Sequence, residues 1–229
     1  MSKMGDGYGS ECHLLRWMGR HRNRLDQEVL SAVGLQGRVE WLDFHFDPSA
    51  VWPDGEWKGL DFLADDAGLQ TAWADFWPQS GNAMNWDAVA WVDSGESREL
   101  LLVEAKAHLG EIASSCGAKG PGREKIARAL DETKRALGVE PACDWVNGYY
   151  QLANRLAVLH FLGRRDVPAH LLLVYFVGDR QDSGRDCPDS AEGWMDALRR
   201  QDDHLGLAGH HVLSARLHKL FLPATGTKG

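Results

Sequence analysis

An apolar segment that ends in a Glu and a Lys constrains the fold of this chain more than any other feature. Residues 98–106 end in Leu-Leu-Leu-Val-Glu-Ala-Lys, and a second apolar segment, 86–93, precedes them across an Asp-Ser-Gly-Glu-Ser turn. Four apolar residues in a row are typical of a buried strand, and the turn residues favour a tight connection. We therefore expect residues 86–106 to form an antiparallel hairpin.

Three charged side chains gather at one end of this predicted hairpin. Glu104 and Lys106 share a face because strand residues two apart point the same way. Asp87 lies on the partner strand, where a short register offset would bring its carboxylate beside Glu104. Two carboxylates and a backbone carbonyl, here that of Ala105, suit Mg²⁺ or Mn²⁺, which would lower the pKa of a bound water. Lys106 would orient or deprotonate that water, or neutralise charge on a phosphate.

Hydrophobic periodicity places further elements around the hairpin. The predicted helices cover 11–33, 123–137, 145–163 and 190–205, and the predicted strands cover 38–46, 59–63, 86–93, 98–106, 170–177 and 210–222. This order predicts a single α/β domain with a central mixed β-sheet flanked by helices on both faces. An irregular, acidic, Trp-rich insertion is expected at 47–84, and a C-terminal helix–strand extension at 190–222.

The spacing Asp87-x16-Glu104-x-Lys106, on a hairpin that follows one helix and precedes another, resembles the PD-(D/E)XK nuclease superfamily. The resemblance spans residues 11–177, with Trp86 where the family name has Pro. It implies a restriction-endonuclease-like core and metal-dependent hydrolysis of phosphodiester bonds, most readily in DNA. It also implies that Asp87, Glu104 and Lys106 are catalytic, and that Mg²⁺ or Mn²⁺ is the cofactor.

The resemblance suggests one more acid for the metal site. Members of this superfamily often place an acidic residue of the first helix beside the metal. Glu28 is the candidate, because on a continuous 11–33 helix it lies about 40° from the centre of the apolar stripe. The alternative is a solvated Glu28 that pairs with Arg24, four residues earlier.

Two segments are candidates for contact with the nucleic acid. Related nucleases carry a Gln and a Tyr in a helix after the Glu-x-Lys strand, which predicts substrate contacts for Gln151, Asn154 and Arg155. A Gly-rich loop followed by a helix start can bind phosphate through free backbone N–H groups, which predicts contacts for Lys119, Arg123 and Lys125. Ordinary solvated helix faces are the alternative for both segments.

The charge distribution bears on the partners. The net charge is −8, but residues 40–66 alone hold eight acids and one base, so the remainder is nearly neutral. A phosphate-binding face is compatible with that distribution, and the acidic segment 40–66 would suit a protein partner or a cover over a basic cleft. A homodimer would allow cleavage of two strands. The absence of a long apolar run and the scattered cysteines predict a cytoplasmic protein with free thiols and no membrane association.

Two other functions remain open from the sequence. One is a non-catalytic member of the same fold that binds nucleic acid or protein, although the complete Asp/Glu/Lys set argues against lost chemistry. The other is a carboxylate-pair glycoside hydrolase, since ten Trp residues would suit sugar stacking. Lys106 on the same face as Glu104, and the lack of barrel-like repetition, argue against that second function.

Overall fold

The computed structural model describes residues 7–42, 56–81, 84–179 and 185–224. Its helices are α1 (Ser10–Arg20), α2 (Arg22–Val33), α3 (Ala67–Phe76), α4 (Gly120–Leu137), α5 (Tyr150–Gly163) and α6 (Ala191–Leu205). Its strands are β1 (Arg38–Trp41), β2 (Trp57–Lys58), β3 (Asn85–Trp86), β4 (Ala88–Asp93), β5 (Arg98–Lys106), β6 (Ala169–Val177) and β7 (Leu217–Pro223). Short 3₁₀ turns cover Asp61–Leu63, Leu109–Glu111 and Ser214–Arg216.

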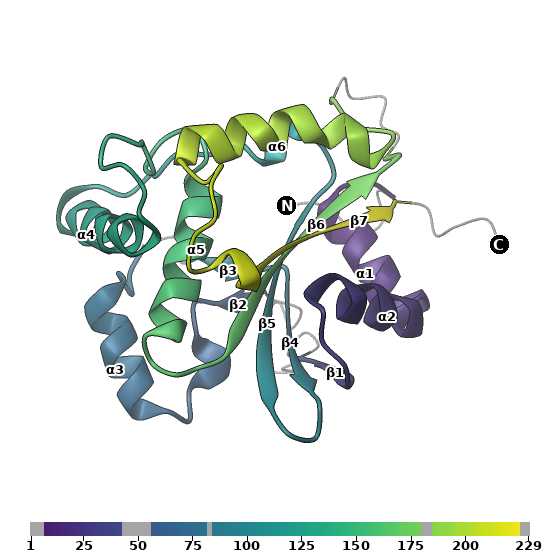
Figure 1. Ribbon diagram of the computed structural model, residues 1–229, viewed down its shortest axis with the longest axis horizontal. Helices are drawn as coiled ribbons and strands as arrows, with labels where there is room; N and C mark the ends of the chain where they lie inside the picture. Colours follow the sequence, from purple (N-terminus) through teal and green to yellow (C-terminus); the bar gives the residue numbers. More distant parts are fainter. Residues whose placement is uncertain (1–6, 43–55, 82–83, 180–184, 225–229) are drawn as a thin grey trace.

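A five-stranded mixed sheet forms the centre of the molecule (Figure 1). Its order is β1-β4-β5-β6-β7, in which β1, β4 and β5 are antiparallel neighbours. Strands β6 and β7 add in parallel to β5. The predicted hairpin is confirmed as β4–β5, and β5 has the predicted bounds. Strands β2 and β3 form a separate two-stranded sheet.

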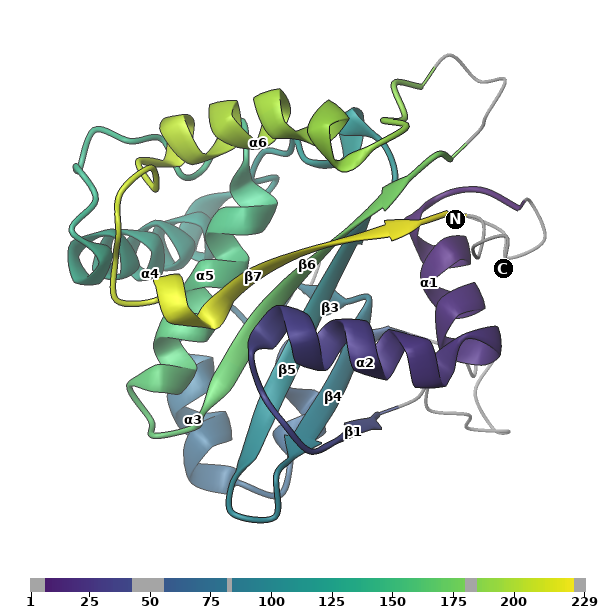
Figure 2. The same cartoon turned by 45° about the vertical axis from the view of Figure 1, so that its right-hand side comes forward.

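Helices cover both faces of the central sheet, as the order of elements predicts (Figure 2). Side chains of β5 alternate between the faces, with Leu100 and Leu102 on one side and Leu101 and Val103 on the other. The first side packs against α3, α4, α5 and α6, and the second against α1 and α2. Because both faces are buried, β5 and β6 are apolar along most of their length and lack the apolar–polar alternation of a one-sided strand.

The first predicted helix is two helices. It breaks at His21, whose φ of −127° is outside the helical range, and α1 and α2 meet there. Each helix therefore has an apolar stripe of its own, with Leu14 and Met18 in α1 and Leu25 and Val29 in α2. Both helices still bury these residues against the same face of the sheet.

The acidic insertion contains a helix that the sequence interpretation missed. Helix α3 packs Trp73 against Phe161 of α5, with ring centroids 5.1 Å apart. The strand predicted near 59–63 is wrong, because the strand β2 ends at Lys58 and a 3₁₀ turn follows. Residues 43–55, which hold much of the predicted acidic segment, lie outside the described residues.

The remaining elements follow the prediction with shifted bounds. Helix α4 begins inside the Gly-rich loop, and α5 begins five residues later than predicted. Strand β7 is shorter than predicted, because a 3₁₀ turn precedes it. The four cysteines are free thiols. Within the described residues, no helix combines the length and apolar character needed to cross a membrane.

Candidate active site at the end of strand β5

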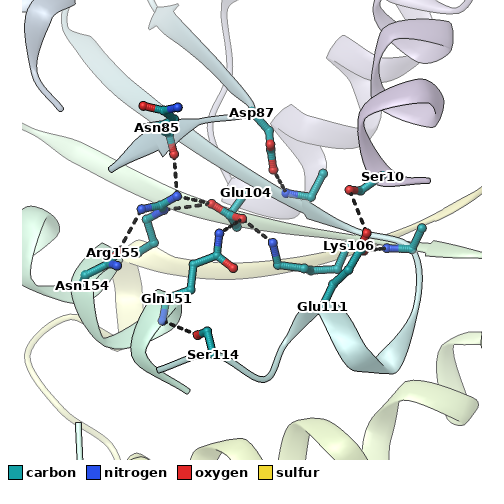
Figure 3. Close-up of polar contacts among 12 residues, drawn as sticks. Ser10, Asn85, Asp87, Glu104, Lys106, Glu111, Ser114, Gln151, Asn154 and Arg155 are labelled. Atoms are coloured by element: carbon teal, nitrogen blue, oxygen red, sulfur yellow. Dashed lines mark hydrogen bonds and ion pairs between the residues drawn. The ribbon is translucent and has the colours of Figure 1, made fainter. Parts of the chain in front are cut away.

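Asp87 lies where the chain enters the central sheet, between β3 of the two-stranded sheet and β4. Strand β3 ends at Trp86 and β4 begins at Ala88, which pairs with Val103 of β5. The next residues of β5 extend beyond β4, so the N–H of Ala105 has no backbone partner from β4. The Asp87 carboxylate accepts that N–H through Oδ2 at 2.7 Å (Figure 3). A buried N–H requires an acceptor, so the Asp side chain continues the hydrogen bonding of β4 beyond its end.

Glu104 lies on the face of β5 that α5 covers, and only 4 % of it is exposed. Its Oε1 accepts hydrogen bonds from Lys106 Nζ and from Gln151 Nε2, the latter at 2.7 Å. Its Oε2 accepts from Arg155 Nε at 2.8 Å and lies 2.7 Å from Arg155 Nη2. The structure therefore brings Glu104 together with Lys106, as predicted from their shared face, and surrounds both oxygens with donors.

Figure 3 shows Arg155 linked to Glu104, Asn154 and Asn85. Besides Glu104, its guanidinium donates to Asn154 Oδ1 at 2.8 Å and to the backbone carbonyl of Asn85. The guanidinium carbon lies 4.6 Å from the ring centroid of Trp86, which is completely buried. Arg155 and Asn154 are thus buried parts of the site, 3 % and 6 % exposed, and the substrate contacts expected for them remain a prediction.

Gln151 remains nearer to the surface than Arg155 and is half-buried. Its backbone N–H donates to Ser114 Oγ at 2.8 Å, which satisfies one of the free N–H groups in the first turn of α5. Ser114 belongs to the loop that follows β5, and it also bridges to Tyr149. The loop and the helix start are therefore joined beside Glu104.

The two carboxyl groups have different protonation preferences. Removal from water and the neighbouring charge of Glu104 raise the pKa of Asp87 to about 7, although Lys106 opposes the rise. Burial also acts to raise the pKa of Glu104, but Arg155 and Lys106 outweigh it and hold that pKa below its ordinary value. Near neutral pH, Glu104 is therefore ionised and Asp87 is partly protonated.

A small cavity of about 20 Å³ opens beside Glu104, a size that accommodates one water molecule. Its lining includes two polar residues that were not predicted from the sequence, Tyr175 of β6 and Gln201 of α6. Gln201 is 3 % exposed, and its Oε1 has no hydrogen-bond partner in the described structure. The predicted C-terminal extension therefore contributes to the site, which no local pattern around Gln201 indicates.

The basic residues predicted to bind phosphate are not among those that line this cavity. Lys119 precedes the first turn of α4 and is exposed. Arg123 donates to the carbonyl of Cys116 at 3.2 Å, and Lys125 donates to the carbonyl of Ala74 in α3. Lys119 is thus the most accessible of the three, and the phosphate contacts remain predictions.

The predicted place of Glu28 needs correction. Glu28 Oε1 lies 3.6 Å from Arg24 Nε, and 40 % of the Glu28 side chain is exposed. The prediction assumed one continuous helix, whereas the break at His21 leaves only the apolar residues of α2 to define the stripe. Relative to Leu25 and Val29, Glu28 lies at the boundary of that stripe, where it meets solvent and Arg24.

Asp87 and Glu104 are the two carboxylates of the predicted cation site that the structure brings to the end of β5. The described residues contain no group of three or more His, Cys, Asp or Glu side chains that could hold a metal ion. Mg²⁺ commonly takes one or two carboxylates and keeps several waters, so two carboxylates fit it. A strand residue directs its N–H and C=O to the same side, so the Ala105 carbonyl faces the Asp87 edge as a third oxygen.

Comparisons of the chain with models of known protein families, with curated proteins and with solved structures found no match. The interpretation of the site therefore depends on its geometry and on the residues of the motif.

Proposed function

We propose that this protein is a metal-dependent nuclease of the PD-(D/E)XK type that hydrolyses phosphodiester bonds, most readily in DNA. The observation that carries the proposal is the hydrogen bond from the N–H of Ala105 to Asp87. It places the Asp87 carboxylate beside the residue that separates Glu104 from Lys106. Residues 18 positions apart in the sequence thereby form one acidic and basic cluster at the end of β5.

The order of elements supports a restriction-endonuclease-like core. Two helices on one face precede the β4–β5 hairpin, α5 covers the other face, and β6 adds in parallel to β5. The cluster lies at the C-terminal end of β5, beyond the last residue of β5 that pairs with β4. A substrate phosphate would approach Asp87 and Lys106 from this side, since Glu104 is buried beneath α5.

Each residue has a distinct part in the proposed reaction. Asp87 and Glu104 would hold Mg²⁺ or Mn²⁺ together with the Ala105 carbonyl and waters, and the cation would supply charge stabilisation and an acidified water. Lys106, whose side chain is 13 % exposed, would leave Glu104 Oε1 to the cation and would orient the attacking water or neutralise charge on the phosphate. Gln151 would keep its contact with the loop through Ser114.

The direct test is cleavage of plasmid and single-stranded DNA by the purified protein with Mg²⁺ or Mn²⁺. We expect cleavage that EDTA abolishes, and that Lys106→Ala reduces by at least about 100-fold. Lys219→Ala is the matched control. Lys219 of β7 pairs with Asp202 of α6 at 2.8 Å and does not line the site. Equal loss in both variants, or cleavage that persists in EDTA, would contradict the proposal.

A non-catalytic nucleic-acid- or protein-binding function is the second candidate. The specific observation that favours it is the full engagement of Glu104, whose two oxygens already accept from Lys106, Gln151 and Arg155. A purely structural cluster would have no need to release any of them. This candidate predicts DNA or protein binding that is independent of the cation and no cleavage of DNA or RNA.

A further inference from the structure

Arg155 differs from the other cationic residue of the site in how completely it is held. Its Nε and Nη2 meet Glu104 Oε2, its Nη1 meets Asn154, and its Nη2 also meets the Asn85 carbonyl. The Trp86 ring covers one face of the guanidinium. Only 3 % of the residue is exposed, against 13 % of the Lys106 side chain. The guanidinium of Arg155 thus makes its contacts inside the protein and is almost inaccessible to solvent.

We propose that Arg155 is a positioning residue that holds Glu104 by Oε2, so that Glu104 offers a cation only Oε1. The inference rests on the proposed metal-dependent function and goes beyond it, because it assigns the coordination mode of Glu104 and removes Arg155 from the substrate contacts. Nothing in the Asp/Glu-x-Lys motif specifies either property.

The two oxygens of Glu104 differ in how readily their partners can be replaced. The partners of Oε1 are Lys106 Nζ and Gln151 Nε2, whose side chains are both partly accessible. The partner of Oε2 is a planar guanidinium fixed by two further acceptors. A guanidinium presents its donors in a rigid fork, so one side of it cannot move without breaking the contacts on the other.

The carbonyl of Asn85 links this arrangement to the other carboxylate. Asn85 and Trp86 form β3, and Asp87 follows directly. Arg155 therefore contacts both Glu104 and the short strand that carries Asp87, through its bond to the Asn85 carbonyl and its position over the Trp86 ring. A residue in this place fixes the separation between the two carboxylates as well as the orientation of one of them.

The same contacts exclude Arg155 from the phosphate backbone. Its donors face Glu104, Asn154 and Asn85, and Trp86 covers its plane. An arginine that binds phosphate adds a salt-dependent contribution to affinity, because each neutralised phosphate releases counterions. Arg155 should make no such contribution.

Three variants test the inference, and two of the measurements need no catalysis. Arg155→Met removes the charge and the fork, Arg155→Lys keeps the charge without the fork, and Lys119→Ala serves as a comparison at an exposed cation of the predicted DNA-binding loop. The affinity for Mn²⁺ is measured by calorimetry on the DNA-free protein. The affinity for a short DNA duplex in EDTA is measured at several salt concentrations.

We expect Arg155→Met to weaken Mn²⁺ binding by about 10- to 100-fold, as loss of a residue that orients a metal ligand does, and Arg155→Lys to restore part of it. A crystal structure of the wild-type protein with Mn²⁺ should show one oxygen of Glu104 on the cation and the other still on Arg155. The salt dependence of DNA binding should be unchanged in Arg155→Met, which removes the charge, whereas loss of a phosphate contact would reduce its slope by about one.

Opposite outcomes overturn the inference. Tighter Mn²⁺ binding in Arg155→Met would show that Arg155 only repels the cation, and two Glu104 oxygens on Mn²⁺ in the wild type would exclude the assigned mode. A reduced salt slope in Arg155→Met, or no Mn²⁺ binding by the wild-type protein, would also overturn it. If Arg155→Met does not fold, the Mn²⁺ affinity of Arg155→Lys and the Mn²⁺-bound structure of the wild type carry the test. One-oxygen Mn²⁺ binding without DNA or RNA cleavage would uphold this inference while the proposed nuclease function fails.

Discussion

Asp87 accepts a hydrogen bond from the backbone N–H of Ala105 through Oδ2 at 2.7 Å, one residue before β4 begins. The bond fixes the carboxylate through the main chain of β5, so its position does not depend on the rotamer of a partner side chain. Glu104 and Lys106, on either side of Ala105, are carried by the same strand. This one hydrogen bond therefore fixes the position of Asp87 relative to Glu104 and Lys106.

The raised pKa of Asp87 makes the stability of the protein depend on pH. Burial, with the charge of Glu104 beside it, raises the pKa of Asp87 to about 7, above the unfolded value near 4. The folded state then binds more protons than the unfolded state between these values, so stability falls as pH rises from about 4 to 7. Asp87→Asn keeps an acceptor for Ala105 and removes the charge.

We therefore expect the Asn variant to gain about 2 kcal/mol on the wild type between pH 4 and pH 8, after allowance for solvent screening. Urea denaturation in EDTA at several pH values measures this difference. Asp61→Asn, at an exposed aspartate, is the control and should follow the wild type. Parallel curves for the wild type and Asp87→Asn would show that Asp87 does not titrate in this range.

The hairpin and its site were predictable because their determinants are local. An apolar run, a polar turn and the two-residue period place Glu104 and Lys106 on one face without further knowledge of the fold. The end of the β4–β5 pairing at Asp87 was not predictable. It depends on the pairing of β3 with β2, which lies almost thirty residues away in the sequence. Gln201 reaches the site from α6 through tertiary packing, which leaves no periodic signal, whereas the resemblance already indicated Arg155 of α5.

The helical errors have different physical causes. The break at His21 occurs in a polar stretch with no Pro, so the apolar residues on either side seem to belong to one helix. Helix α3 did have a signal, because Asp66 precedes Leu69, Trp73 and Phe76 at helical spacing.

The cap of α3 gives a second prediction. Asp66 Oδ1 accepts from the N–H of Leu69 at 2.8 Å, which satisfies one of the free donors at the helix start. Asp66→Ala should lower the free energy of unfolding by about 1 kcal/mol. Asp65→Ala is the matched control at the preceding, exposed aspartate, and urea denaturation at pH 7 should place it within about 0.5 kcal/mol of the wild type. Equal losses would contradict a capping role.

A histidine pair on the opposite face of the sheet should make the protein sensitive to acid. His170 Nδ1 and His218 Nε2 are 2.8 Å apart, and Glu99 and Arg216 face His170 from the other side. Burial, with the charge of His170 next to it, lowers the pKa of His218 to about 4. The unfolded chain protonates first, so stability is lost as pH falls from about 6.5 to 4.

We expect His218→Gln to reduce this acid-dependent loss by about 1 kcal/mol, discounted for the partial exposure of the ring. Urea denaturation at pH 5 and pH 7.5 gives the two free energies. His210→Gln, at an exposed histidine, should leave the difference between the two pH values unchanged. An equal difference between the two pH values in the wild type and in His218→Gln would show that His218 is protonated without cost, because the opposite contribution of Asp87 is common to both proteins.

The contact between Gln151 and Glu104 offers a test of the cation site that requires no substrate. Gln151 Nε2 donates to Glu104 Oε1 at 2.7 Å, so Gln151→Glu places a second carboxylate against the first. Without a cation, repulsion between like charges should lower the melting temperature. With Mn²⁺, the added oxygen ligands should bind the ion more tightly, and a ligand that binds only the folded state stabilises it in proportion to the logarithm of its affinity.

We therefore expect Mn²⁺ to raise the melting temperature of Gln151→Glu by several degrees more than that of the wild type, as measured by differential scanning calorimetry. Gln151→Leu loses the same hydrogen bond without a new ligand, and its response to Mn²⁺ should not exceed that of the wild type. An equal response of the two variants would place the cation away from Glu104.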